Sequence, residues 1–145
     1  MVSWRVVWQF YLSEQVNGHG IDARHDTSDR ALAQDVRFFR IATGPIGGTY
    51  FPVGALLAGA VSNPPGSRPC AEGGNCGVPG MIAVTQTTQG SVENVDLLSA
   101  GSVESGFVQA DVAYYAFAGK GRFAKTGPVT QLRAIANLYP ESLHV

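Results

Sequence analysis

Apolar residues in this chain form short continuous runs, separated by polar turns and by stretches with helical spacing. Runs of about four to eight apolar residues are typical of buried strands. Strand-like segments rich in apolar residues occur at residues 36–42, 81–86, 105–109 and 132–138. Because helical patterns follow the first three runs, we expect the order βαβαβαβ and a right-handed parallel sheet flanked by helices. The predicted fold class is therefore α/β.

The first helical stretch carries one apolar stripe. Its members recur at i, i+3, i+4, i+7 and i+8, and they are Val53, Leu56, Leu57, Ala60 and Val61. Pro52 suits the first turn of such a helix, and the Pro-Pro-Gly sequence at residues 64–66 ends it. This stripe predicts the face that packs on the sheet.

Polar residues mark the starts of the next two helices. Ser91 is the predicted N-cap of the second helix, with Glu93 and Asp96 in its first turn and Gly101 near its end. Asp111 is the predicted N-cap of the third. We expect both helices to be short.

Each of the first three strands leads into a polar turn, at residues 43–50, 89–94 and 109–111. The carboxyl ends of parallel strands lie along one edge of a sheet, so the three helix N-termini are expected to point at one place. Helix N-termini favour anions. The sequence therefore predicts a binding site for a small molecule that carries negative charge.

The turns themselves leave alternatives open. Gly44, Gly47 and Gly48 give a ligand room near the backbone, but their spacing matches neither a phosphate loop nor a dinucleotide-binding motif. A tight turn without a ligand explains them equally well, and capping alone explains Ser91 and Asp111. No pattern assigns a nucleophile and a base. We therefore expect no enzymatic activity, no cofactor and no metal.

Composition narrows the possible functions. The chain has 145 residues, 45% hydrophobic and 14% charged, with a formal net charge of −1. Nucleic-acid surfaces need concentrated positive charge, so we expect no nucleic-acid partner. Lys120, Arg122 and Lys125 form the densest basic group, which we interpret as a solvated loop. No apolar run approaches the roughly 20 residues that span a bilayer.

The two cysteines, Cys70 and Cys76, lie in a glycine-rich stretch that is flexible enough to bring them together. A disulfide is the favoured interpretation and indicates an oxidising compartment. A zinc site, which needs further Cys or His ligands, and two free thiols are the alternatives.

Residues 1–34 differ from the rest of the chain because they lack the regular strand and helix pattern. No signal-peptide apolar region precedes the Ala-Leu-Ala sequence at residues 31–33, which has the small-x-small form of a signal-peptidase site. We interpret residues 1–34 as a poorly ordered leader region, lost or replaced relative to a native one. Residues 35–145 are the predicted α/β domain.

Five segments together closely resemble the TAXI family, the extracytoplasmic solute receptors of tripartite ATP-independent periplasmic (TRAP) transporters. They are residues 40–52 (RIATGPIGGTYFP), 76–80 (CGVPG), 90–94 (GSVEN), 109–114 (QADVAY) and 138–141 (LYPE). The resemblance covers residues 36–145. It implies a periplasmic-binding-protein-like fold of type II, with two lobes around a cleft, of which this chain holds the first lobe and is truncated before the second.

The resemblance also implies a function and a site. Family members bind small organic acids or amino acids such as glutamate in the periplasm and present them to TRAP membrane subunits. The residues carried over by matching motif are Thr43, Gly48, Thr49, Tyr50, Ser91, Asn94, Gln109 and Asp111. The alternatives are an α/β enzyme or cofactor-binding domain that uses the same helix N-termini for a phosphate, and a truncated fragment without function.

Overall fold

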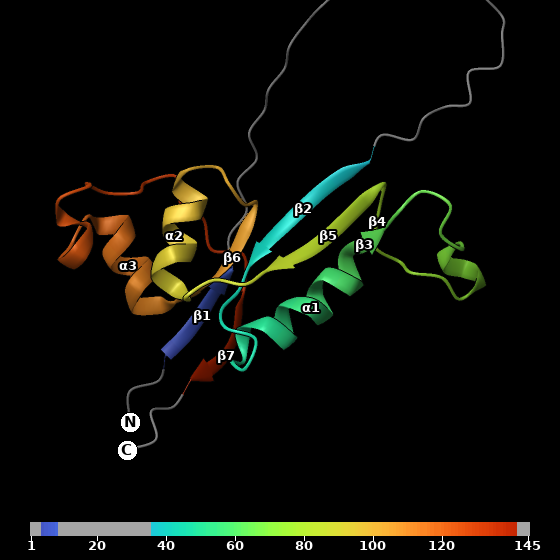
Figure 1. Ribbon diagram of the computed structural model, residues 1–145, viewed down its shortest axis with the longest axis horizontal. Coiled ribbons are helices and arrows are strands. Elements are labelled where there is room, and N and C mark those ends of the chain that lie inside the picture. Colours follow the sequence, from blue (N-terminus) through green and yellow to red (C-terminus); the bar gives the residue numbers. More distant parts are fainter. Residues whose placement is uncertain (1–3, 9–35, 142–145) are drawn as a thin grey trace, which may run out of the picture.

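The computed structural model describes residues 4–8 and 36–141. In this part of the chain, seven strands form one mixed sheet, and three α-helices pack against it (Figure 1). The strand order is β4-β3-β5-β2-β6-β1-β7. The α/β class is thus confirmed, and the arrangement is consistent with a single lobe of a periplasmic binding protein.

Three parallel strands form the centre of the sheet. β2 (Arg37–Ala42) pairs along its whole length with β5 (Met81–Gln86) and at its carboxyl end with β6 (Ser105–Gln109). These strands confirm the predicted runs at residues 36–42, 81–86 and 105–109. Ala42, the last residue of β2, is opposite Gln86, the last residue of β5, and on its other side it is opposite Gly106, from which β6 continues to Gln109.

The predicted strand at residues 132–138 is wrong. The strand in this region is β7 (Asn137–Glu141), and it pairs antiparallel with β1 (Trp4–Trp8), a strand that the sequence pattern does not predict. The prediction assumed that the apolar residues of this segment are buried in the sheet. Ile135, however, is 39% exposed, and no sheet neighbour covers it. β1 also pairs antiparallel with β6, so the sheet is mixed rather than wholly parallel.

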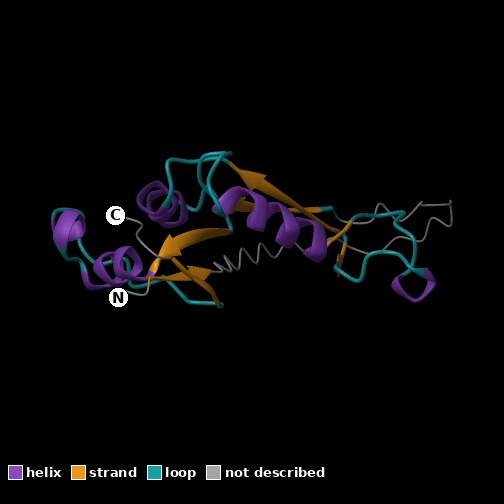
Figure 2. Cartoon of the chain, turned by 90° about the horizontal axis from the view of Figure 1, so that it is seen from below, coloured by secondary structure: helices purple, strands orange, loops and turns teal. Residues whose placement is uncertain are grey.

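Two short strands extend the opposite edge of the sheet. β3 (Ser62–Asn63) pairs antiparallel with β5 and parallel with β4 (Val78–Pro79). Between them runs a long loop that contains the 3-10 helix η1 (Cys70–Glu72). This loop projects away from the helices that cover the sheet (Figure 2).

The three α-helices follow the central strands as predicted. They are α1 (Tyr50–Val61), α2 (Ser91–Ser99) and α3 (Ala110–Ala118). The predicted apolar stripe of α1 is partly wrong, because Leu56 is 76% exposed. The buried positions are Tyr50, Gly54 and Ala58. Two of these are small, which allows the helix to approach the sheet closely.

The predicted helix caps need correction as well. Ser91 is the first helical residue of α2, and Gly90, at φ +105°, is the N-cap. Asp111 likewise lies inside α3, whose N-cap is Gln109. Asp96 lies beyond the first turn of α2, which contains Glu93.

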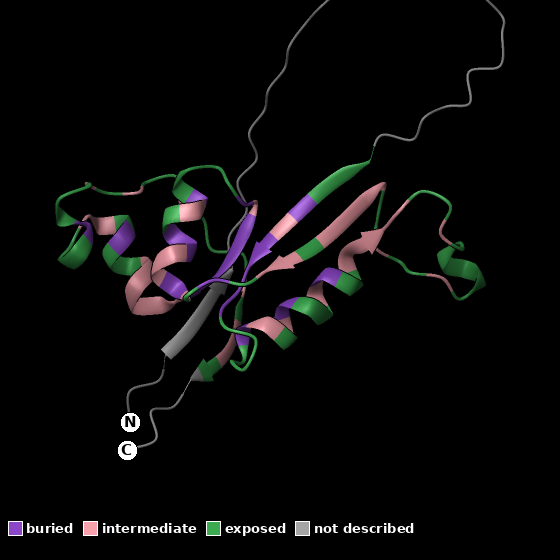
Figure 3. Cartoon of the chain, in the orientation of Figure 1, coloured by how far each residue is buried: buried purple, intermediate pink, exposed green. Residues whose placement is uncertain are grey.

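The core has two parts, one on each face of the sheet. Phe39 and Ile41 of β2 pack with α1, whereas the next residue, Ala42, packs with α2 and α3. Side chains alternate between the faces of a strand, so α1 covers one face and α2 and α3 the other. Burial is deepest in β6 and in the carboxyl half of β2 (Figure 3). None of the described helices is long and apolar enough to cross a membrane.

Candidate functional site

A pocket of about 270 Å³ lies at the carboxyl ends of the three parallel strands. All three predicted turns contribute to its lining, which consists of Gly44, Pro45, Gly48, Thr49, Tyr50, Gln89, Gly90, Ser91 and Gln109. The convergence that the sequence predicts is therefore present. The volume is at the small end for ligand pockets and suits a metabolite of a few carbon atoms.

The structure brings together five of the eight predicted site residues. These are Gly48, Thr49, Tyr50, Ser91 and Gln109. The other three, Thr43, Asn94 and Asp111, are not among the lining residues. Sequence reasoning did not assign Pro45 or Gln89 to the site, although both belong to the turns that it identified.

The Ser91 hydroxyl connects the three turns. Its Oγ accepts a hydrogen bond from the backbone N–H of Gln109 at 2.9 Å and lies 3.4 Å from the Tyr50 hydroxyl. The Tyr50 ring stacks on Phe107 of β6, with 5.3 Å between the ring centroids. Ser91 therefore positions the pocket walls, in addition to any contact with a ligand.

Behind the pocket lies a buried polar network centred on Asn94. Its side-chain amide donates to the backbone carbonyls of Thr43 at 2.6 Å and Phe107 at 2.7 Å. Its Oδ1 lies 2.6 Å from the hydroxyl of Thr88. Asn94 is fully buried, as is Thr43, whose hydroxyl donates to the carbonyl of Gln86 at 2.8 Å. Both side chains thus fix the turns relative to the strands.

Asp111 lies in the first turn of α3, and its Oδ1 is buried without a hydrogen-bond partner. A buried, unpaired carboxylate oxygen costs free energy. The structure shows no contact that explains this arrangement. The ligand-binding role of Asp111 stays a prediction.

The pocket combines a neutral lining with exposed helix ends. All of its lining residues are uncharged, and none of the three helices has a hydrogen-bonded side-chain cap. The first N–H groups of a helix have no intrahelical acceptor. Acidic residues occupy the first turns of α2 and α3 but not that of α1. An anionic group is therefore favoured most near Thr49 and Tyr50, where α1 begins.

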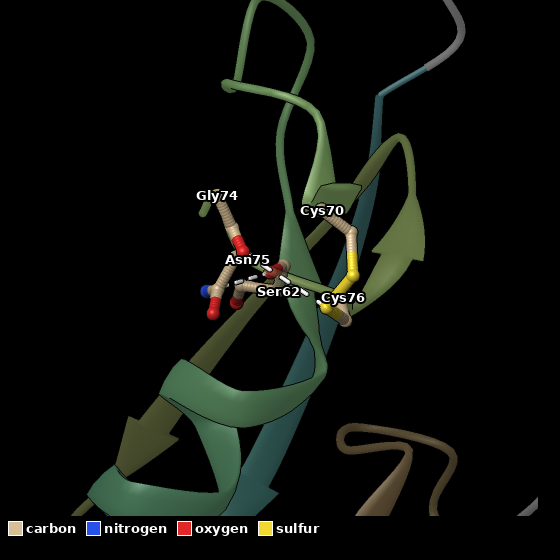
Figure 4. The surroundings of a disulfide bond; sticks show 5 residues. All are labelled: Ser62, Cys70, Gly74, Asn75 and Cys76. Carbon is tan, nitrogen blue, oxygen red and sulfur yellow. Dashed lines mark hydrogen bonds between the residues drawn. A yellow bond between two sulfur atoms is a disulfide. The ribbon is translucent and has the colours of Figure 1, made fainter. Parts of the chain in front are cut away.

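The far end of α1 meets the disulfide loop, residues 64–77. Cys70 and Cys76 form the predicted disulfide, which removes the zinc and free-thiol alternatives (Figure 4). The side-chain amide of Asn75 donates to the carbonyls of Gly59 at 2.7 Å and Ser62 at 3.0 Å. It thereby satisfies carbonyls at the C-terminus of α1 that lack helical partners. One helix thus joins the pocket to the disulfide loop.

A model of the NMT1-like family matches residues 41–145, which include all three turns and the disulfide loop. The chain belongs to the NMT1-like family. This is a periplasmic-binding-protein-like family, which indicates a solute-binding role, and its members are typically extracytoplasmic. The disulfide agrees with that location. Except for β1, the predicted leader region lies outside the described residues.

Proposed function

We propose that this NMT1-like chain provides a ligand-binding lobe of an extracytoplasmic receptor for a small carboxylate-bearing solute. The solute is an amino acid such as glutamate or another small organic acid, and membrane subunits of a TRAP-type transporter receive it. The observation that carries this proposal is the convergence of three uncapped helix N-termini on one neutral pocket.

The proposed ligand follows from the donors around the pocket. A carboxylate accepts hydrogen bonds from backbone N–H groups and from hydroxyls such as that of Thr49, and the dipole of α1 adds favourable electrostatic energy. No lining residue is charged, so the lining supplies no ammonium or guanidinium group to hold the anion. Recognition by N–H and hydroxyl donors suits reversible capture without covalent chemistry.

Isothermal titration calorimetry with glutamate, other amino acids and dicarboxylic acids tests this proposal. Thr49→Ala should weaken the affinity about fivefold, the effect of one lost hydrogen bond. Thr87→Ala is the matched control, because Thr87 is exposed on the neighbouring loop and does not line the pocket. Its affinity should equal that of the parent chain.

Two outcomes would contradict the proposal. If no carboxylate binds, the pocket is not a solute site in this chain. If a nucleotide or inorganic phosphate binds and carboxylates do not, the pocket serves the phosphate of a cofactor or an enzyme substrate instead. Delivery is tested separately, by solute uptake into proteoliposomes that hold TRAP membrane subunits, which should depend on the added protein.

A further inference from the structure

Positive charge is segregated into one part of the chain. Residues 112–140 contain Lys120, Arg122, Lys125 and Arg133 and no Asp or Glu, whereas the rest of the chain has 6 basic and 11 acidic residues. The formal net charge of the whole chain is −1, although this one segment is strongly basic. Charge alone is compatible with a solvated loop, so the surroundings of these side chains decide what the segment does.

The cations lie on a turn that is anchored to the core. Arg122 belongs to the 3-10 helix η2 (Gly121–Ala124), and Lys125 follows it directly. Residues three apart project on the same side of a 3-10 helix, so Arg122 and Lys125 share one side. Both are exposed, while Phe123 between them is only 4% exposed and packs into the core. The turn thus holds its charges outward.

Exposed aromatic rings adjoin these charges. Tyr114, Tyr115 and Phe117 of α3 are 55%, 45% and 50% exposed. The Lys120 ammonium lies 5.4 Å from the centroid of the Tyr114 ring and 3.2 Å from its hydroxyl. The exposed rings of α3 and the exposed cations that follow it are therefore linked by the contact between Lys120 and Tyr114. We call them together the α3–η2 surface, which comprises Tyr114, Tyr115, Phe117, Lys120, Arg122 and Lys125.

We propose that the α3–η2 surface docks reversibly on a bilayer that contains anionic phospholipids. Lys and Arg side chains are attracted by anionic headgroups, each contributing a similar increment of binding energy. Aromatic rings with polar edges favour the depth of the headgroups. A protein partner with an acidic surface would use the same cations, and protein interfaces also favour aromatic residues, so that partner is the alternative outcome of the test.

The α3–η2 surface and the pocket are made of different residues. α3 begins beside Gln109, at the pocket, and ends just before η2. Its nine residues are roughly 13 Å long. The cations of η2 therefore lie about one helix length from the pocket, and no residue of the α3–η2 surface lines it. This proposal goes beyond solute binding and does not depend on which solute is bound.

Vesicle co-sedimentation of the full chain tests the proposal. Vesicles with about 30 mol% phosphatidylglycerol in phosphatidylcholine should retain the protein, pure phosphatidylcholine should not, and raising the salt from about 50 to 500 mM should release it. The variant Lys120→Gln/Arg122→Gln/Lys125→Gln should bind at least about tenfold more weakly. Arg37→Gln/Arg68→Gln is the matched control, because both cations are exposed but lie outside this surface.

A second variant tests the rings. Tyr114→Ser/Phe117→Ser keeps every charge and should weaken vesicle binding several-fold. Circular dichroism and solute calorimetry on each variant separate a docking defect from unfolding and from loss of the pocket. Equal retention by neutral and anionic vesicles overturns the proposal, as does equal binding by the triple variant and its control. If the triple variant keeps vesicle binding but slows solute delivery to proteoliposomes, the partner is an acidic protein surface and the lipid proposal is wrong.

Discussion

The pocket edge and the disulfide loop lie at opposite ends of α1 and are held in different ways. At the pocket edge, buried Thr43, Thr88 and Asn94 tie the turns to the strands with hydrogen bonds. The disulfide loop is mostly exposed (Figure 3), and a covalent bond and Asn75 hold it. Hydrogen bonds can fix geometry where water is excluded, whereas an exposed loop with little apolar contact needs a covalent constraint.

Ligand binding depends on how firmly the pocket edge is held. A site that binds by backbone N–H groups needs those groups held in place, since each must lie within hydrogen-bond distance of the ligand. The buried network supplies this at the pocket edge. The disulfide loop lies at the other end of α1 and contributes no residue to the pocket. We therefore expect substitutions at the two ends to separate stability from affinity.

Removal of the Asn94 side chain should have the largest effect. Asn94→Ala removes the side-chain hydrogen bonds to the carbonyls of Thr43 and Phe107 and one acceptor of the Thr88 hydroxyl, all of them buried. We expect the free energy of unfolding to fall by about 3 kcal/mol, because three buried hydrogen bonds of about 1 kcal/mol each are lost. Urea denaturation measures this. Asn137→Ala, at an exposed position in β7, is the control, and an equal loss in both variants would contradict the role of the network.

Two glycines of α1 compare the ends of the helix directly. A Cβ at Gly54 would lie 2.6 Å from Thr43 Cγ2, whereas a Cβ at Gly59 would meet no atom within 4 Å. Gly54→Ala should therefore destabilise the fold by about 2–3 kcal/mol through overpacking. Gly59→Ala should stabilise it by about 0.5–1 kcal/mol, because alanine favours a helix. Thermal and urea unfolding should show opposite signs, and the same sign in both would mean that α1 does not sit as closely on the sheet as described.

Loss of the disulfide should lower stability and spare the pocket. Cys70→Ser/Cys76→Ser removes the constraint on a short loop, for which the chain-entropy estimate is about 2 kcal/mol. We expect that decrease in the free energy of unfolding, together with a solute affinity within about twofold of the parent chain. A large loss of affinity in a variant that remains folded would show that α1 transmits the state of the loop to the pocket.

The sequence predicted the parts of this fold in which local pattern and tertiary environment agree. The runs of β6 and of the carboxyl half of β2 are covered on both faces, and β5 packs on the α1 face. Leu56 and Ile135 are apolar yet exposed, and periodicity cannot show which face finds a neighbour. β1 and β7 pair across most of the length of the chain, and no local signal encodes such a pairing.

The candidate site was partly predictable for a similar reason. The order of strands and turns was enough to bring Gly48, Ser91 and Gln109 to one pocket. It could not show that Asn94 points away into the core, because a polar residue at a helix start has the same signature in either role. The sequence thus identified the turns that form the site. Which side chains line the pocket and which support it from the core depends on tertiary packing.

The smallest expected effect concerns an ion pair between β2 and Glu104, the residue just before β6. Arg40 Nη2 lies 2.5 Å from Glu104 Oε1, in a partly exposed position. Burial alone would raise the pKa of Glu104, but hydrogen bonds from Arg40 and its charge outweigh burial and hold that pKa below its ordinary value. A lowered folded-state pKa stabilises the protein above the ordinary range of a Glu carboxyl, and the benefit disappears as the pH falls through the folded-state value.

Glu104→Gln should therefore lower the free energy of unfolding at neutral pH by less than about 1 kcal/mol, as for other partly exposed pairs. Urea denaturation of both chains at a series of pH values measures the difference. It should shrink as the pH falls through the acidic range in which Glu104 takes up its proton. A difference that stays constant with pH would mean that Glu104 acts through packing rather than charge. Because the pair lies apart from the buried network, its loss should leave solute affinity unchanged.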